Sequence, residues 1–291
     1  MDKLSFCIDL NYMRGLRESI EEIKKRLNDK NKGRFLKYFI PSLFEFLSMF
    51  ENCKYNYQFL LNISKWNLEH KKLTQSVSCL LESILTMLTE IYGIEGIPES
   101  KEIARMMINK RILTENYQEL KRLNDTYLKI REIRNLIAHS DMYSEIDITN
   151  FEDRIRNLII EVENLLNSSE IQELPTKLDL DKLFEYVSED GDDINMKRIL
   201  KAIIIIELGK IFNLRSYDLK YIEKLIRRKA LTSRYSLLDT LGDIYYKLNS
   251  KRFKLNKDEV VGLYNRCKEI LSSKDITQIT LWISIEEILS L

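Results

Sequence analysis

An all-α fold is the prediction that the sequence supports most directly. The 291-residue chain contains only 8 glycines and 3 prolines, whereas proteins rich in hairpins need many of both for turns with special backbone angles. Apolar residues make up 44% of the chain. Over long segments they recur at steps of three and four residues, which is the spacing of one helix face. We therefore expect helices joined by short polar loops, in two domains.

The first third of the chain predicts three helices. Residues 14–30 and 34–52 are expected to form two of them, and the segment WNLEHKKL, from Trp66 to Leu73, is expected to end one helix and begin the next. The third helix is the clearest in the chain, and Gly93 is predicted to end it. Its apolar face consists of Leu73, Val77, Leu80, Leu81, Ile84, Leu88 and Ile91.

Three further helices are predicted before residue 168. Pro98 and two glycines indicate a loop followed by a short helix. A second amphipathic stripe then consists of Leu120, Leu123, Tyr127, Ile130, Ile133 and Ile137. It breaks at SDMYSEIDITNFED, where Thr149 or Asn150 is expected to cap the next helix. Together with the preceding helix, these elements predict a four-helix arrangement. The apolar residues of the last helix are Phe151, Ile155, Leu158, Ile159, Val162 and Leu165.

The second half of the chain follows a predicted linker. Small and polar residues surround Pro175 between Asn167 and Asp179, with no sustained apolar stripe, as in interdomain linkers. The predicted divisions are an N-terminal helical segment at 1–34, a helical domain at 35–168, a linker at 169–178 and a C-terminal helical domain of unknown role at 179–291. Helices in the last are expected at 180–190, 193–213, 216–230, 232–249, 257–272 and 276–290.

Charge and hydropathy limit the cellular setting. The chain has 46 basic and 45 acidic residues, so its net charge would not attract nucleic acid to the protein as a whole. Any RNA site must therefore be a local group of basic residues. The longest apolar stretch, residues 202–212, is interrupted by Glu207 and Lys210 and is shorter than the roughly 20 residues of a membrane span. The first residues show no secretory signal. We expect a cytoplasmic protein without a membrane partner.

The reactive residue types exclude several classes of site. Four cysteines are widely separated, with no Cys-x-x-Cys pair and two histidines in the chain, so we expect no metal and predict that the thiols are buried or half-buried. No P-loop, glycine-rich dinucleotide turn, nucleophile elbow or His-Glu-x-x-His motif occurs. The sequence therefore predicts no cofactor.

The segment REIRNLIAHS contains the best candidate for chemistry. Arg134 can neutralise a phosphate and His139 can move a proton at neutral pH, which suits phosphodiester cleavage without a metal. Five residues advance a helix by about 500°, which leaves the two side chains about 140° apart. Either the helix ends or bends between them, or each cooperates with groups from a second copy. In the alternative interpretation, Arg134 pairs with Glu132 or Glu145, and His139 only lies near a helix C-terminus.

Two segments carry a resemblance to a known family. RNLIAHS resembles the Arg-x(4-6)-His signature of HEPN ribonucleases, and its Asn after Arg and its final Ala-His-Ser look like the version in ancillary ribonucleases of type III CRISPR systems. The segment from Trp66 to Ser83 is similar to one in which a Trp-containing turn leads into a helix with Gln and Glu, here Gln75 and Glu82. The resemblance covers roughly residues 35–168.

The resemblance implies a site and a reaction. Arg134 and His139 take the catalytic positions, and Asn135 and Ser140 take RNA-positioning ones. It implies a HEPN homodimer with a composite site at its interface, which acts as a metal-independent endoribonuclease on single-stranded RNA in CRISPR-associated or related antiviral defence. Cleavage would proceed by attack of the RNA 2′-hydroxyl. Family members usually carry an N-terminal sensor of cyclic oligoadenylates; fewer than 35 residues precede the matching region, so we expect neither the sensor nor this activation.

Two other functions are compatible with the same residues. One is a non-catalytic interaction or regulatory protein with a HEPN-like dimerisation domain, and the other is a HEPN toxin of a toxin–antitoxin system. The C-terminal domain could then cover or control the first. The environment of the motif separates these interpretations: joint exposure of Arg134 and His139 in a polar cleft favours an enzyme, whereas burial of either in a structural pair favours a scaffold.

Overall fold

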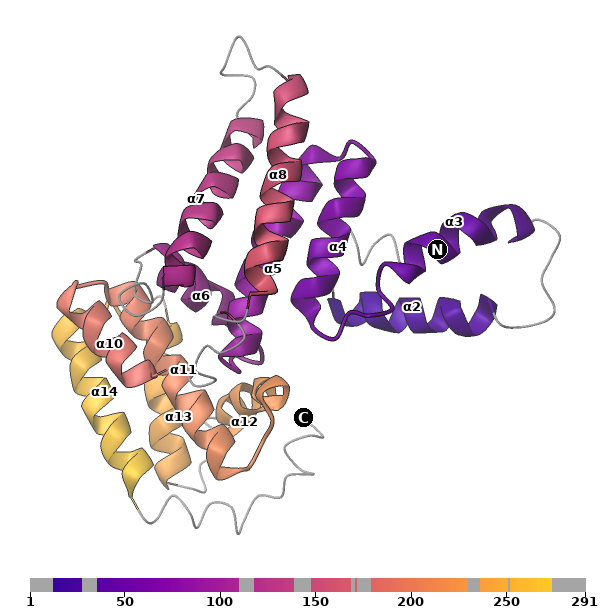
Figure 1. The fold of residues 1–291 in the computed structure, drawn as a ribbon. Helices are drawn as coiled ribbons and strands as arrows, with labels where there is room; N and C mark the ends of the chain where they lie inside the picture. The colour runs from indigo at the N-terminus through magenta and orange to yellow at the C-terminus, as the bar shows by residue number, and fades with distance from the viewer. Residues whose placement is uncertain are drawn as a thin grey trace. The chain divides into compact units, whose positions relative to one another are not determined.

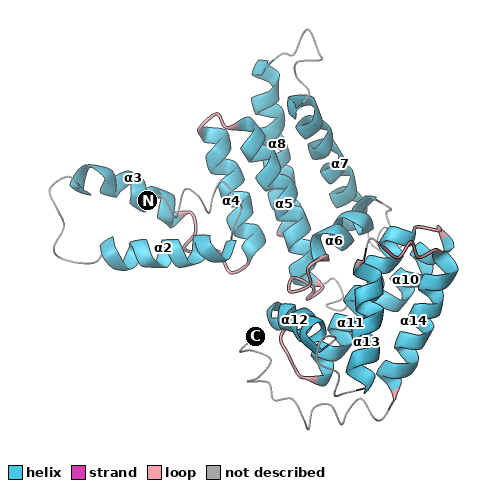
Figure 2. Cartoon of the chain, turned by 180° about the vertical axis from the view of Figure 1, so that it is seen from behind, coloured by secondary structure: helices cyan, strands magenta, loops and turns pink. Residues whose placement is uncertain are grey.

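The described part of the chain is helical throughout. The computed structural model describes residues 13–27, 36–109, 118–138, 148–168, 171, 179–229, 236–250 and 252–273. These residues form twelve α-helices and a 3-10 turn, and no strand occurs among them (Figure 2). The predicted all-α fold is confirmed. None of the described helices combines the length and the apolar character that a membrane span requires.

The chain forms two compact units. The first comprises residues 1–88 and 113–174, and the second comprises residues 89–112 and 175–291. The second unit therefore includes a segment from the middle of the range 35–168 that the sequence assigns to one domain. Its helix carries an apolar face that packs in the second unit, as described below. The roles assigned to the predicted domains stay predictions.

Six helices make up the described part of the first unit (Figure 1). They are α2 (Met13–Leu27), α3 (Leu36–Ser48), α4 (Asn56–Glu69), α5 (Leu73–Ile91), α7 (Gln118–Ala138) and α8 (Ile148–Leu166). Helix α8 packs against both α4 and α7. Helices α2 to α5 share a core, whose buried members are Ile20, Leu47, Phe50, Phe59, Ile63 and Cys79.

The junction of α4 and α5 is built by a compact set of hydrogen bonds. The backbone N–H of Lys71 donates to Leu68, and that of Lys72 donates to Asn67, at 3.0 and 2.8 Å. Lys71 adopts φ 59°, so the helix ends in a Schellman motif with a lysine where glycine is usual. Reciprocal bonds of 2.8 Å, from each serine hydroxyl to the other's carbonyl, join Ser64 to Ser76. The predicted change of helix at this segment is confirmed.

Helix α11 (Asp193–Ile211) is the centre of the second unit. It packs against α6 (Ser100–Asn109), α10 (Leu180–Glu189), α12 (Lys220–Lys229), α13 (Ser236–Asn249) and α14 (Lys257–Ser272). The longest apolar stretch of the sequence lies in this helix because a helix covered on several sides needs apolar residues around its circumference. Its buried residues are Met196, Ile199, Leu200, Lys201, Ala202, Ile203, Ile204, Ile205, Leu208 and Gly209.

Helix α6 belongs to the second unit because its apolar face is buried there. Ile103, Ala104 and Met107 are fully buried, and the helix packs against α11. Just before it, Glu99 forms an ion pair with Lys201, which is only 7% exposed. The predicted four-helix arrangement is therefore wrong for this short helix, since the helix belongs to the second unit and packs against α11.

Most predicted helix ends are confirmed, and two predictions differ from the structure. Gly93 adopts φ 63° directly after α5, as predicted. The cap at Thr149 or Asn150 is wrong, because α8 already begins at Ile148. The helix predicted at 216–230 is a 3-10 turn at Ser216–Asp218 followed by α12. The helix predicted at 276–290 lies outside the described residues.

Candidate functional site

Of the four predicted site residues, Arg134 and Asn135 are described, and they lie near the C-terminal end of α7. Arg134 and Asn135 are both exposed, and every residue from Arg134 to Ala138 is helical. The helix therefore does not end between Arg134 and Ala138. His139 and Ser140 lie outside the described residues, so their predicted roles stay predictions.

Contacts with α8 fix the orientation of α7. The hydroxyl of Thr126 donates a 2.6 Å hydrogen bond to Glu161 on α8, and the ammonium of Lys129 lies 3.5 Å from the same carboxylate. The helix also buries four of the six apolar residues that the periodicity predicts, and a fifth, Ile137, is half-buried. The buried residues of this stripe are Leu123, Tyr127, Ile130 and Ile133.

Arg134 lies on the same side of α7 as the buried stripe. It follows Ile130 by four residues and Tyr127 by seven, which are rotations of about 40° and about −20°. Both of those residues are at most 3% exposed, whereas Arg134 is exposed. The stripe that packs inside the unit along most of α7 thus becomes accessible in the last turns of the helix. Arg134 is the charged residue at this point of the stripe.

Arg134 is not part of a structural pair among the residues that the structure describes. No described residue forms an ion pair or a hydrogen bond with it. Glu132 is itself exposed and does not pair with it, so this part of the alternative interpretation is wrong for the described structure; Glu145 lies outside the described residues. As far as the described residues are concerned, the guanidinium donors of Arg134 are therefore available to a ligand.

The start of α8 lies beside the end of α7 in both views (Figures 1 and 2). The ammonium of Lys71, from the α4–α5 junction, lies 2.5 Å from the carboxylate of Glu152 on this first part of α8, and Arg156 lies 3.3 Å from it. The hydrogen bond from Lys71 is the main cause that lowers the pKa of Glu152 below its usual range. The ion pair between Lys71 and Glu152 holds the start of α8 against the α4–α5 junction. Helix α8 is the element that follows the motif in the sequence.

The upstream segment of the resemblance forms the α4–α5 junction. Trp66 lies within α4, not in a turn, and its ring contacts Phe46 at 5.5 Å and His70 at 4.2 Å between centroids. His70 is exposed and is the C-cap residue of α4. Gln75 is exposed on α5, and Glu82 is half-buried on the same helix.

The described cysteines are buried or half-buried, as the sequence predicts. Cys79 and Cys267 are buried and Cys53 is half-buried, all as free thiols. Burial raises the pKa of Cys79 and of Cys267 to about 12. These thiols are not poised as nucleophiles. Cys7 lies outside the described residues.

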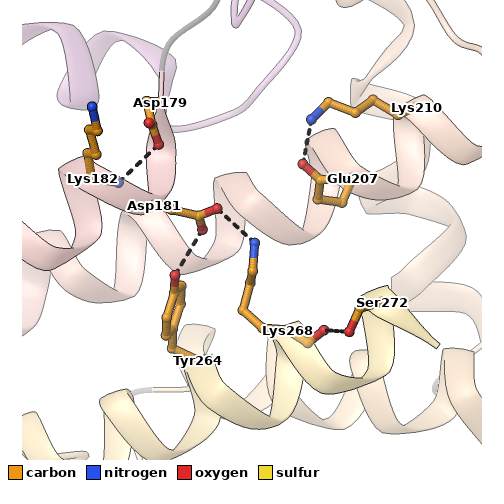
Figure 3. Close-up of polar contacts among 8 residues, drawn as sticks. All are labelled: Asp179, Asp181, Lys182, Glu207, Lys210, Tyr264, Lys268 and Ser272. Carbon is orange, nitrogen blue, oxygen red and sulfur yellow. Dashed lines mark hydrogen bonds and ion pairs between the residues drawn. The ribbon is translucent and has the colours of Figure 1, made fainter.

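A second polar cluster, which the sequence does not reveal, lies in the second unit (Figure 3). The carboxylate of Asp181 accepts hydrogen bonds from Tyr264 at 2.9 Å and from Lys268 at 2.7 Å. The bond with Asp181 raises the pKa of Lys268, whereas burial is the main cause that raises the pKa of Tyr264. The cluster ties α10 to α14 and borders a hollow of about 400 Å³. The hollow is lined by Asp179, Leu180, Asp181, Ile203, Ile206, Glu207 and Lys210.

The carboxylates around this hollow are occupied within the protein. Asp179 accepts the backbone N–H of Lys182 as the N-cap of α10, and Glu207 pairs with Lys210 at 2.5 Å. A carboxylate that is already paired or caps a helix gains less from a new cation. The cluster is therefore explained by the packing of α10, α11 and α14.

Comparison with known proteins shows that the chain is similar to a CRISPR-associated protein. It is 31% identical over 228 residues to the CRISPR-associated protein MJ1674 of Methanocaldococcus jannaschii. The chain is a homologue of a CRISPR-associated protein. The match covers 75% of this chain and 34% of the relative, so the chain spans about a third of that protein's length. No protein-family model matches the chain, and no solved structure matches it significantly.

Proposed function

We propose that this protein is a metal-independent endoribonuclease that cleaves single-stranded RNA in a CRISPR-associated process. The homologous CRISPR-associated protein supports the setting. The HEPN-like motif at the end of α7 supports the reaction. The exposed position of Arg134, with no ion pair or hydrogen bond to a described residue, is the observation that carries the proposal.

The position of Arg134 favours a ligand over a structural role. A charged residue on the core-side stripe of a helix normally needs a partner, because desolvating an isolated charge is costly. Arg134 stays exposed instead, beside the polar Asn135. Two oxygens of a tetrahedral phosphate match the parallel N–H donors of the planar guanidinium fork well. RNA or the partner copy in a composite site would then cover the end of this stripe.

The proposed reaction needs one positive charge and one group that moves protons. The 2′-oxygen of the RNA loses its proton and bonds to the adjacent phosphorus while the bond from phosphorus to the 5′-oxygen breaks. The leaving 5′-oxygen takes up a proton. The products are a 2′,3′-cyclic phosphate and a 5′-hydroxyl. His139 acts as general acid or base, and Arg134 stabilises the charge that develops on the phosphate.

A composite site accounts for the angle between the two residues. Arg134 lies on the core-side stripe of α7, and residues up to Ala138 continue the helix. A regular helix would place the next side chain, that of His139, about 140° away from Arg134. We propose that a homodimer brings Arg134 of one copy to His139 of the other. Asn135 and Ser140 would position the RNA around them.

The test is cleavage of a labelled single-stranded RNA in EDTA by the full chain. His139→Ala is expected to reduce the rate about 10²- to 10⁴-fold, as removal of a general acid or base does. Arg134→Ala is expected to reduce it about 10²- to 10³-fold. Arg266→Ala is the matched control, because Arg266 is an exposed arginine on α14 in the second unit. Analysis of the product ends should find the 2′,3′-cyclic phosphate.

Two outcomes would contradict the proposal. One is full activity of His139→Ala, which would show that the activity comes from elsewhere or from a contaminant. The other is no cleavage by the parent protein with any RNA tested, while Arg134→Ala changes dimerisation. That second result would favour the non-catalytic dimerisation domain.

A further inference from the structure

The end of α13 and the loop that follows it expose two aromatic rings. Tyr246 is 57% exposed and Phe253 is 44% exposed, and their ring centroids lie 6.4 Å apart in an edge-on arrangement. The adjacent Tyr245 is only 2% exposed, so α13 has a separate face that packs into the unit. Exposed aromatic residues that cluster on a surface commonly mark a binding site.

Four exposed basic residues lie close to the two rings in the sequence. No described residue forms an ion pair with any of four exposed cations, and the acidic residues nearest in sequence are Asp243, Asp258 and Glu259. The carboxylate of Glu259 already accepts the backbone N–H of Asn256 at 2.8 Å. We call Tyr246, Phe253 and the four cations the basic aromatic surface. The cations are Lys247, Arg252, Lys254 and Lys257.

The loop is held in place by hydrogen bonds at both ends. Lys197 on α11 donates to the carbonyl oxygen of Leu255 at 2.9 Å. At the start of α14, Asn256 and Glu259 form a reciprocal capping box. At the end of α13, the Asn249 side chain donates to Tyr245 at 3.0 Å and accepts from Lys201 at 3.1 Å. A surface ordered before binding loses less entropy when a ligand binds.

We propose that the basic aromatic surface binds single-stranded RNA. Phosphates would contact the four cations, and unstacked bases would stack on Phe253 and Tyr246. A duplex does not offer free base faces to these rings. A second copy docked through the same face would place like charges together, which disfavours that occupant. The inference goes beyond the proposed cleavage, because binding here requires neither Arg134 nor His139.

The test measures binding without cleavage. The parent is the full chain with His139→Ala, and the probe is a fluorescent oligouridylate of about 20 nucleotides, followed by anisotropy in EDTA. Phe253→Ala is expected to weaken binding about 10-fold, as loss of one stacked base does. Phe253→Trp should retain the affinity. Phe44→Ala is the matched control, because Phe44 is also 44% exposed but lies in the first unit.

The charges are tested through the dependence on salt. Lys254→Ala and Arg252→Ala should each lower the slope of log affinity against log salt concentration by about 0.7 for single strands. Equal weakening by Phe44→Ala and Phe253→Ala would overturn the proposal, as would absence of binding by the parent. If Phe253→Ala abolishes dimerisation, measured by light scattering, but leaves the RNA affinity unchanged, the surface binds a protein partner. That result would also overturn the proposal.

The two proposals can fail separately. If Phe253→Ala weakens RNA binding but the wild-type protein cuts no RNA, the basic aromatic surface stands and the proposed cleavage fails. If His139→Ala abolishes cleavage while Phe253→Ala leaves the RNA affinity unchanged, the reverse holds. Circular dichroism should show an intact fold for Phe253→Ala, since an exposed ring contributes little to the core.

Discussion

The position of Arg134 shows what one residue can reveal and what it cannot. The helix period correctly places Tyr127 and Ile130 on a buried face, and the same arithmetic places Arg134 on that face. The periodicity alone could not predict that Arg134 is exposed, because exposure depends on how far neighbouring helices extend along α7. The sequence equally allowed pairing with Glu132, which the structure does not contain.

Replacement of Arg134 should therefore cost little stability. Arg134→Leu is expected to change the free energy of unfolding by less than about 0.5 kcal/mol, because no structural pair with a described residue is lost. Thr126→Val on the same helix should cost about 1–2 kcal/mol, because it removes the hydrogen bond from the buried Thr126 to the half-buried Glu161. Urea unfolding of both variants measures the contrast. A larger loss for Arg134→Leu than for Thr126→Val would assign Arg134 a structural role.

The buried cysteines allow a second prediction at the same scale. A thiol reacts as its thiolate, and a pKa of about 12 leaves only about one thiol in 10⁴ ionised at pH 8. In a Cys7→Ser background, Cys79 and Cys267 should therefore resist a disulfide reagent at pH 8 while the protein is folded. Cys53 should react first. All three should react promptly in guanidinium chloride, and prompt reaction of all three in the native protein would contradict the burial.

At the scale of the element, the sequence predicts helices well where they are amphipathic and less well where they are not. Helix α5 ends close to Gly93, as the sequence predicts, and α14 has the predicted bounds 257–272. Helix α11 is buried on several sides, so its apolar stretch indicates burial without indicating which helices cover it. The partner of α6 was not predictable either, since an apolar face does not specify its own partner.

Two glycine substitutions separate a packing requirement from a helix preference. A Cβ at Gly96 would collide with the backbone carbonyl oxygen of Ser216, so Gly96→Ala should destabilise the protein by about 1–3 kcal/mol. Gly262 lies inside α14, and a Cβ at this position would meet open space. Gly262→Ala should stabilise by about 0.5–1 kcal/mol. Thermal unfolding checks both signs, and equal shifts in one direction would show that the close approach at Gly96 is not maintained in solution.

At the scale of the whole molecule, the order of segments along the chain differs from their grouping in space. The linker predicted around Pro175 coincides with the start of the C-terminal part of the second unit. The sequence could not show that residues 89–112 join that part, because the segment lies between two stripes of the other unit. The sequence names Arg134 and Asn135 as site candidates, but it could not predict their exposure, because exposure depends on the packing of α7.

The ion pair of Lys201 gives the test of this grouping. A fragment of residues 175–291 would lack α6 and Glu99, which leaves the buried ammonium of Lys201 without its carboxylate. Loss of one partner of a buried pair costs about 3–5 kcal/mol, and the apolar face of α11 that α6 covers would also meet water. We expect the fragment to be cleaved by a protease much faster than the same residues in the full chain.

Lys201→Met is the variant that distinguishes the charge from the packing. In the fragment it removes the unpaired charge and should recover part of the protease resistance, whereas in the full chain it leaves Glu99 without its cation and should be destabilising. Addition of a peptide of residues 89–112 should protect the unmodified fragment more than the Lys201→Met fragment, because only the lysine can restore the ion pair. A fragment as resistant as the full chain would mean that 89–112 is dispensable, and the C-terminal part could then be assayed separately for control of cleavage.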